Sequence, residues 1–283
     1  MRYGFVLPGG TAVEQLEQAI LAEKSGWDGV FVWEAAYGVD AWTLLAAIAQ
    51  RTSRIRLGTM LTPLPWRRPW KVASQAITLD QLSGGRTILS VGLGAVSTGL
   101  GKTGEQLDRR LRAEMLDEGI DLMAGLWQGQ LAYAGRHYSV DLSAREDLAR
   151  VAEFPQQPRI PIWVVGVWPR PRSMRRVLRC DGVLPASMDE RGFRPTAPQD
   201  IEAMLAWLRA RGAARPGFDV VIEGATPSDD AAGAAAIVAP WEQAGCTWWI
   251  ESRWELSSDA TERSRRVCER LSAGPPRTPA TER

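Results

Sequence analysis

The sequence predicts a single (β/α)8 barrel, an α/β fold in which eight parallel strands alternate with helices. The apolar strand-like segments are continuous runs, as expected for strands that are buried on both faces. They alternate with helix-like segments along about 270 residues, the usual size of such a barrel. Residues 54–94 hold a strand, a helix and a second strand, the unit that joins two parallel strands. A doubly wound open sheet is the alternative, but the later strands show no reversal of strand order.

Capping signals and glycines delimit the helices of the first half of the chain. Thr11 and Glu14 form a capping box, and Gly26 ends the helix that follows. Asp40 can cap the second helix, and the glycine pair 84–85 ends the third. We expect strands at 3–7, 29–33, 55–61 and 87–91, and a long helix at 105–127.

The second half repeats the alternation of strands and helices. Strands are expected at 160–166, 181–185, 218–223 and 247–251, and helices at 169–178, 198–210, 231–244 and 259–271. One domain is therefore predicted over residues 1–272, with a polar loop excursion at 139–159. The Pro-rich, charged residues 273–283 are expected to form a disordered tail.

Composition excludes several classes of protein. Lys and Arg number 34 and Asp and Glu number 33, and the net charge of +1 gives no sign of a nucleic-acid partner. No run of about 18 apolar residues predicts a membrane span, and the amino terminus lacks the pattern of a signal peptide. The cysteines, Cys180, Cys246 and Cys268, form no CxxC pair and fit a reducing compartment. We therefore expect a cytoplasmic protein.

The chain has a single histidine, His137. A Ser/His/Asp hydrolase, a histidine-ligated zinc site or a two-histidine iron site would have to use this residue. It lies in a polar segment with a glycine turn, residues 131–140, which predicts a hairpin at the surface. A metal-dependent barrel hydrolase is therefore disfavoured, and we predict no metal site.

Small or polar residues follow two neighbouring predicted strands. Thr62 follows one strand, and the pair Gly94-Ala95 follows the next. The carboxyl ends of parallel strands are where barrel enzymes place their sites. The segment 94–103, GAVSTGLGKT, is similar to a phosphate-binding P-loop but has Val96 where that motif needs glycine. We interpret Gly94 instead as a point where the backbone can approach a flat ring closely.

The same stretch resembles the luciferase-like family of flavin-dependent monooxygenases, which also contains enzymes that use the deazaflavin coenzyme F420. The family pattern is a strand ending in a Gly-Thr-x-x-Thr-Pro turn, an Arg/Pro loop, a helix ending Leu-Asp-x-Leu-Ser-x-Gly-Arg, and a strand ending Gly-x-Gly. In this chain these motifs are Gly58–Pro63, Arg67–Pro69, Leu79–Arg86 and Gly92–Gly94. The resemblance extends over about residues 1–270 and implies a luciferase-like barrel.

The resemblance implies that reduced FMN, or alternatively coenzyme F420, binds at the carboxyl ends of the strands. Thr62, Gly94 and Ala95 would contact the ring of the cofactor. Family members hold the cofactor phosphate with a Gly-Gly pair, and this chain has Gly166-Val167 at that position. Arginines in the first turn of a helix are unfavourable for the helix dipole alone, which favours an anion there. The residues expected at the phosphate are Gly166, Val167, Trp168, Arg172 and Ser173.

Two carboxylates are candidate catalytic residues. Glu34 ends the second strand, where family members commonly have an acidic residue followed by histidine; here Ala35 follows. Glu105 would be the carboxylate that some F420-dependent members use after the fourth strand. Tryptophans near strand ends predict an apolar substrate pocket. The pocket residues that we expect are Trp33, Trp66 and Trp249.

These features predict a flavin- or F420-dependent, monooxygenase-like oxidoreductase that acts on a small, largely apolar organic substrate. The cofactor carries the redox chemistry, and with FMN a separate flavin reductase could supply its reduced form. The resemblance also implies a homodimer. The alternative is a divergent barrel without a cofactor that serves as a binding or assembly subunit, which the missing second glycine and the missing histidine would fit.

Overall fold

The computed structural model describes residues 1–99, 102–144, 155–156, 159–213, 215–254 and 258–277. Within these residues, eight strands each precede a helix, which is the succession predicted for a (β/α)8 barrel. The chain divides into two compact units. Unit 1 comprises residues 1–31, 54–56 and 163–283, and unit 2 comprises residues 32–53 and 57–162.

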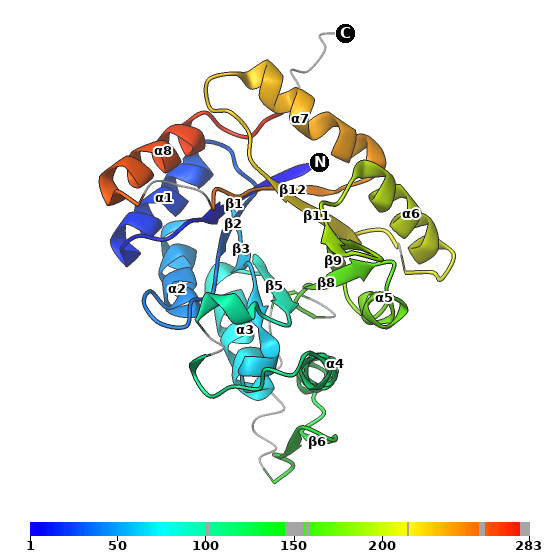
Figure 1. Cartoon of the computed structure of the whole chain (residues 1–283). Helices are drawn as coiled ribbons and strands as arrows, with labels where there is room; N and C mark the ends of the chain where they lie inside the picture. Colours follow the sequence, from blue (N-terminus) through cyan, green and yellow to red (C-terminus); the bar gives the residue numbers. More distant parts are fainter. Residues whose placement is uncertain (100–101, 145–154, 157–158, 214, 255–257, 278–283) are drawn as a thin grey trace. The chain divides into compact units, whose positions relative to one another are not determined.

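Unit 1 contains a run of five parallel strands (Figure 1). In order of pairing they are β8 (Ile162–Trp168), β9 (Gly182–Asp189), β11 (Asp219–Gly224), β12 (Trp248–Glu251) and β1 (Arg2–Leu7). A short strand, β10 (Gly192–Arg194), pairs antiparallel with β9. Most of β2 (Gly29–Val32) also belongs to this unit. Its helices are α1 (Ala12–Lys24), α5 (Pro171–Val177), α6 (Pro198–Arg209), α7 (Ala231–Ala244) and α8 (Ala260–Ser272).

One face of this sheet packs against the helices, and we call it the outer face. Gly166 of β8 lies there, because a Cβ at this position would be 2.9 Å from a methyl group of Val177 in α5. Glu251 of β12 also lies there, and its carboxylate is 3.5 Å from the Arg270 guanidinium of α8. In parallel neighbouring strands, residues in register lie on the same face of the sheet. Gly166 and Glu251 therefore show which residues of the other strands lie on the outer face.

Three aromatic rings fill the opposite face, which we call the inner face. The Trp163 and Trp248 rings are 5.3 Å apart, and Phe31 is 5.4 Å from Trp163 and 6.1 Å from Trp248. All three side chains are almost fully buried. Glycine is required beneath them, because a Cβ on Gly4 would lie 2.8 Å from Phe31 and one on Gly29 would lie 2.9 Å from Trp248. The amino-terminal part of the inner face is therefore a packed core, as is usual in barrels.

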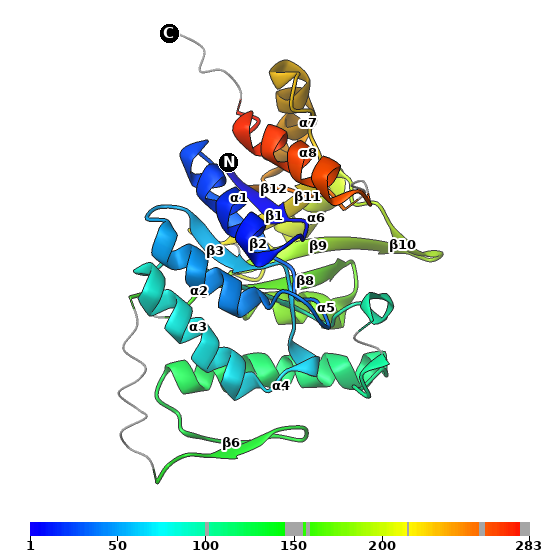
Figure 2. The same cartoon turned by 90° about the vertical axis from the view of Figure 1, so that its left-hand side faces the viewer.

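Unit 2 contains most of β3 (Arg56–Thr59) together with β4 (Thr62–Pro63) and β5 (Thr87–Gly92). Both β3 and β4 pair in parallel with β5. Its helices are α2 (Ala41–Arg51), α3 (Pro69–Ser83) and α4 (Arg109–Trp127), with the short 3-10 helices η1 (Leu64–Trp66) and η2 (Val96–Thr98). The strands β6 (Ala132–Ala134) and β7 (Ser139–Asp141) form an antiparallel hairpin after α4 (Figure 2). The helices α2, α3 and α4 pack side by side in chain order.

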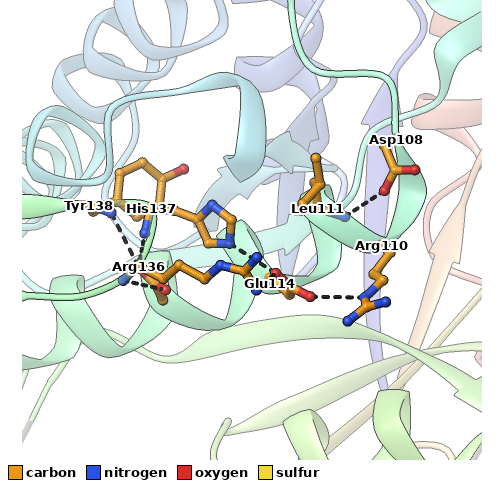
Figure 3. A network of polar contacts seen from close by, with 8 residues as sticks. Asp108, Arg110, Leu111, Glu114, Arg136, His137 and Tyr138 are labelled. Carbon is orange, nitrogen blue, oxygen red and sulfur yellow. Dashed lines mark hydrogen bonds and ion pairs between the residues drawn. The ribbon is translucent and has the colours of Figure 1, made fainter.

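Two carboxylates of α4 attach the β6–β7 hairpin to this helix (Figure 3). Glu118 accepts the backbone N–H groups of Arg136, His137 and Tyr138 at 2.9, 2.9 and 3.2 Å. Glu114 accepts a hydrogen bond from the Arg136 guanidinium at 3.0 Å and lies 3.1 Å from His137 Nε2. The single histidine therefore lies in a hairpin, as predicted, and joins it to α4.

In the described part of the chain, no group of three or more His, Cys, Asp or Glu side chains could hold a metal ion.

Several boundaries differ from those predicted. The strand expected at 55–61 ends at Thr59, and β4 follows as a separate two-residue strand. The helix expected from residue 105 begins at Arg109, because Asp108 caps it by accepting the Leu111 N–H at 2.8 Å. The strand expected at 181–185 runs on to Asp189, because β10 pairs with its extension.

The ends of the predicted domain are described in part. Arg277 donates to the Asp28 carboxylate at 3.2 Å, so the chain still contacts unit 1 five residues beyond the predicted boundary at 272. Of the loop excursion predicted at 139–159, residues 145–154 and 157–158 lie outside the described residues, as do residues 278–283 of the predicted tail.

No helix in the described ranges has the length and apolar character needed to cross a bilayer.

Candidate active site

In unit 2, the loop after β2 buries a carboxylate. The Glu34 side chain is 6% exposed, and its Oε1 forms an ion pair with Arg67 and accepts the Trp42 indole N–H at 3.2 Å. The other oxygen, Oε2, is buried and has no hydrogen-bond partner among the described residues. Burial raises the pKa of Glu34, while the Arg67 guanidinium, the Thr62 hydroxyl and the Trp42 indole counteract this rise.

Local sequence signals position the partners of Glu34. Asp40 caps α2 by accepting the Thr43 N–H at 2.7 Å, which places Trp42 in the first turn of that helix. Arg67 lies in the Arg/Pro loop before α3, where Pro69 is the first helical residue. A second nitrogen of Arg67 donates to Gln75 of α3 at 2.9 Å, so the guanidinium is held on both sides.

The residues predicted to contact the cofactor ring lie at the ends of β4 and β5. Thr62 is fully buried and donates its hydroxyl hydrogen to Thr59 at 2.9 Å. Gly94 has a φ of +76°, and a Cβ there would lie 2.5 Å from the Trp66 ring and 2.7 Å from Pro63. The space that the glycine leaves open is therefore occupied by Trp66. Ala95 is exposed.

Trp66 itself is part of a packed cluster. It is 6% exposed, its indole N–H donates to the Gln106 carbonyl at 2.8 Å, and the Arg112 guanidinium lies 5.1 Å from its ring. Arg112 also donates to the carbonyls of Leu93 and Gly94 at 3.0 and 2.9 Å. Of the other residues predicted in this unit, Trp33 is half-buried and Glu105 is exposed.

The residues predicted at the cofactor phosphate lie at the end of β8 and in the first turn of α5. A Cβ on Gly166 would point toward α5, as described above. The Val167 N–H is already satisfied, because it donates to the Ser173 hydroxyl at 2.9 Å. Trp168 packs edge-on against Trp207 of α6 at 6.5 Å. Arg172 is exposed, so its guanidinium is open to an anion.

Trp249 lies in a closed polar cluster on the outer face. It is 2% exposed and donates its indole N–H to Glu251 at 3.3 Å. Glu251 also accepts the Thr226 N–H and hydroxyl at 2.9 and 2.7 Å. Arg253 is 3.3 Å away from this carboxylate, which is 0% exposed. Trp249 was predicted to line the substrate pocket, but it is instead packed within this cluster on the helix side of the strand.

Sequence reasoning missed a second carboxylate at a strand end, Glu223. It lies in β11 in register with Ile250 of β12 and is exposed, although its neighbours are buried. Burial by the surrounding protein nevertheless raises its pKa, while hydrogen bonds from Trp254 and Ser252 counteract this rise. A charged residue within an apolar strand, just before the glycine that ends it, was the available signal.

Comparisons with known proteins show relatives of parts of this chain. The chain is 34% identical over 166 residues to an F420-dependent glucose-6-phosphate dehydrogenase of Segniliparus rotundus, covering 53% of this chain and 46% of that protein. It is 38% identical over 125 residues to 4-hydroxyprotoasukamycin monooxygenase of Streptomyces nodosus, covering 42% of this chain and 34% of that protein. The chain thus spans about half, or less, of the length of these curated relatives.

A solved structure shares the fold over nearly the whole chain. It is an F420-dependent secondary alcohol dehydrogenase in complex with an F420-acetone adduct, with a TM-score of 0.75 and 18% identity, covering 96% of this chain and 98% of that one. The model of a family described as luciferase-like monooxygenase matches residues 3–267. The chain therefore has the predicted (β/α)8 barrel fold and belongs to the luciferase-like monooxygenase family, whose members include F420-dependent oxidoreductases and monooxygenases.

Proposed function

We propose that the chain is an oxidoreductase that binds coenzyme F420 near Glu34 and acts on a small, largely apolar organic substrate. The observation that carries this proposal is the buried Glu34 carboxylate with one oxygen left without a partner among the described residues. A buried polar atom without a hydrogen bond costs about 1–3 kcal/mol, so a protein retains it where a ligand or a reaction uses it.

The open oxygen of Glu34 is a hydrogen-bond acceptor held in a fixed position. Arg67 and Trp42 occupy the first oxygen and hold the carboxylate in place. An N–H or O–H group of a ligand would satisfy the second. The bound deazaflavin would supply hydride chemistry, and the residues of this chain would bind and orient it.

The choice of F420 over FMN rests on the names of relatives and on charge. Two of the proteins compared above are named as F420-dependent. F420 carries a phosphodiester and several carboxylates, whereas FMN carries one phosphate. The exposed arginines Arg170, Arg172 and Arg175 near the end of β8 suit the more anionic molecule. Because Ser173 occupies the Val167 N–H, these guanidinium groups would replace backbone amides as phosphate ligands.

An equilibrium titration with F420 and with FMN tests this function, with bound cofactor followed by fluorescence. We expect F420 to bind more tightly than FMN. Arg172→Ala should weaken F420 binding roughly tenfold, as expected for the loss of a charge-assisted hydrogen bond of about 1.4 kcal/mol. Arg209→Ala is the matched control, because Arg209 is also exposed but ends α6. Equal affinity of Arg172→Ala and the wild type would remove Arg172 from the site.

A second candidate function is a barrel without cofactor that acts as a binding or assembly subunit. Two observations favour it: Trp66 fills the space above Gly94, and Ser173 satisfies the Val167 N–H. The same titration decides between the two, because a cofactor-free subunit would take up neither F420 nor FMN. A homodimer, and a reductase partner if FMN is the cofactor, are implied by the family resemblance alone.

A further inference from the structure

We propose that Glu223, held by Ser252 and Trp254, accepts a hydrogen bond from a hydroxyl group on the substrate. This assignment rests on the proposed function, and it specifies the substrate as an apolar body that carries one hydroxyl group. All three residues belong to unit 1 and lie at or just beyond the carboxyl ends of β11 and β12.

The strand register places Glu223 on the inner face. Val221 pairs with Trp248, and Glu223 pairs with Ile250. Trp248 belongs to the aromatic core of the inner face, and side chains two residues apart on a strand share a face. Glu223 therefore points away from the helices, into the space that the strands surround.

The aromatic core closes the space below Glu223. The rings of Phe31, Trp163 and Trp248 fill the inner face at the level of Val221 and beneath it. Glu223 lies two residues further toward the carboxyl end, a distance of about 7 Å along a strand. A ligand that enters from the carboxyl ends would thus meet Glu223 directly above this apolar floor.

Solvent reaches Glu223 although its neighbours are shielded. Val221 and Ile250 are 1% and 0% exposed, whereas Glu223 is classed with the exposed residues. At the same time protein atoms surround the carboxylate closely enough to raise its pKa. Glu223 also lines a cavity of about 340 Å³, whose other lining residues include Leu184, Val221 and Trp241, and a small molecule could replace water there.

The partners of Glu223 leave capacity for a ligand. Ser252 and Trp254 each donate a side-chain hydrogen bond to it, and among the described residues no Lys or Arg forms an ion pair with it. A carboxylate can accept about four hydrogen bonds. The Trp254 side chain is 54% exposed, so its ring offers an apolar surface beside the acid. Together they match a ligand with an apolar body and a polar end.

Asp219 provides an internal contrast on the same strand and the same face. It accepts hydrogen bonds from Thr247 at 2.9 Å and Trp163 at 3.1 Å, and it lies at the level of the aromatic core. A ligand that enters from the carboxyl ends of the strands would meet the rings before it met Asp219. Glu223 is therefore the acid of the inner face of β11 that lies on the carboxyl side of the rings.

The test compares two probes that differ in one hydroxyl group, para-fluorobenzyl alcohol and para-fluorotoluene, by fluorine NMR titration. We expect the wild type to bind the alcohol about tenfold more tightly than the toluene, which is the value of one hydrogen bond to a charged group. Glu223→Leu should bring the ratio close to one, and Glu223→Gln should retain part of it. The matched control is Glu202→Gln, a change of an exposed acid on α6, which should leave the ratio unchanged.

Two results would overturn the assignment: a wild type that does not prefer the alcohol, and a Glu223→Leu variant that keeps the preference. Thermal unfolding of each variant shows whether it is folded. If Glu223→Leu is not folded, the alcohol preference of Glu223→Gln is compared with that of the wild type instead. F420 titration of the same samples separates the two proposals. An alcohol preference that depends on Glu223 in a protein without F420 uptake would contradict the proposed function but leave this site in place.

Discussion

Glu34 in unit 2 and Glu251 in unit 1 are both buried carboxylates close to the ends of strands, yet their surroundings differ. Glu251 accepts hydrogen bonds from Thr226 and Trp249 and has two arginines close by. Glu34 has partners on one oxygen and none among the described residues on the other. Burial alone therefore does not indicate a functional carboxylate. Unused hydrogen-bonding capacity is the more informative property.

The closed cluster of Glu251 should give the largest effect on stability. Glu251→Leu would leave the Arg270 guanidinium, which is 2% exposed, without its carboxylate. Removing one partner of a buried ion pair costs about 3–5 kcal/mol, and we expect a loss of that size in the free energy of unfolding. Urea unfolding measures it.

The double variant Glu251→Leu with Arg270→Met is the control, because an apolar pair of similar volume often restores stability. A loss below about 1 kcal/mol in the single variant would show that Glu251 is not a structural residue of this kind, since exposed ion pairs contribute at most that much. Glu251 and Glu34 would then not differ as a structural and a functional carboxylate.

Glu34 should show a smaller effect that depends on pH. Its pKa is raised in the folded protein, so the contribution to stability is present below the ordinary value of 4.5 and is lost as pH rises through the folded pKa. Glu34→Gln cannot titrate. We therefore expect the stability of this variant, relative to the wild type, to increase as pH rises above 4.5.

Urea unfolding of both proteins at several pH values measures this difference. Glu242→Gln is a suitable control, because Glu242 is exposed and forms its ion pair with the amino terminus. A difference between Glu34→Gln and the wild type that stays constant with pH would contradict a raised pKa at Glu34.

The half-buried carboxylates of α4 should have the smallest effect, confined to the hairpin. Glu118→Gln weakens the acceptor of three backbone N–H groups at Arg136, His137 and Tyr138. We expect these amides to exchange their hydrogens faster, with little change in global unfolding, because β6 and β7 form a sheet of their own, separate from the parallel strands. Hydrogen exchange followed by mass spectrometry measures the rates. Faster exchange throughout unit 2 would show that the hairpin supports more of the fold than its contacts indicate.

Element order was predictable from the sequence because its signals are local. The capping box of Thr11 and Glu14 is present in the structure, as is the Asp40 cap. The glycine at residue 84 ends α3 with a φ of +66°. Such signals depend on a few neighbouring residues, so they need no knowledge of tertiary structure.

Side-chain direction was less predictable. Continuous apolar strands do not alternate, so nothing in residues 248–251 tells which tryptophan is on the inner face; Trp248 is, and Trp249 is not. The environment of Glu34 depends on Trp42, 8 residues away in the sequence, and on Arg67, which is 33 residues away and meets it only in the fold.

The most direct test of a ligand site at Glu34 is the affinity of F420 for the wild type and for Glu34→Gln, measured by quenching of F420 fluorescence. We predict that the wild type binds F420 and that the variant binds it about tenfold more weakly, because an amide is a weaker acceptor than a carboxylate. Equal affinities would place the cofactor elsewhere, and no binding by the wild type would contradict the proposed function itself.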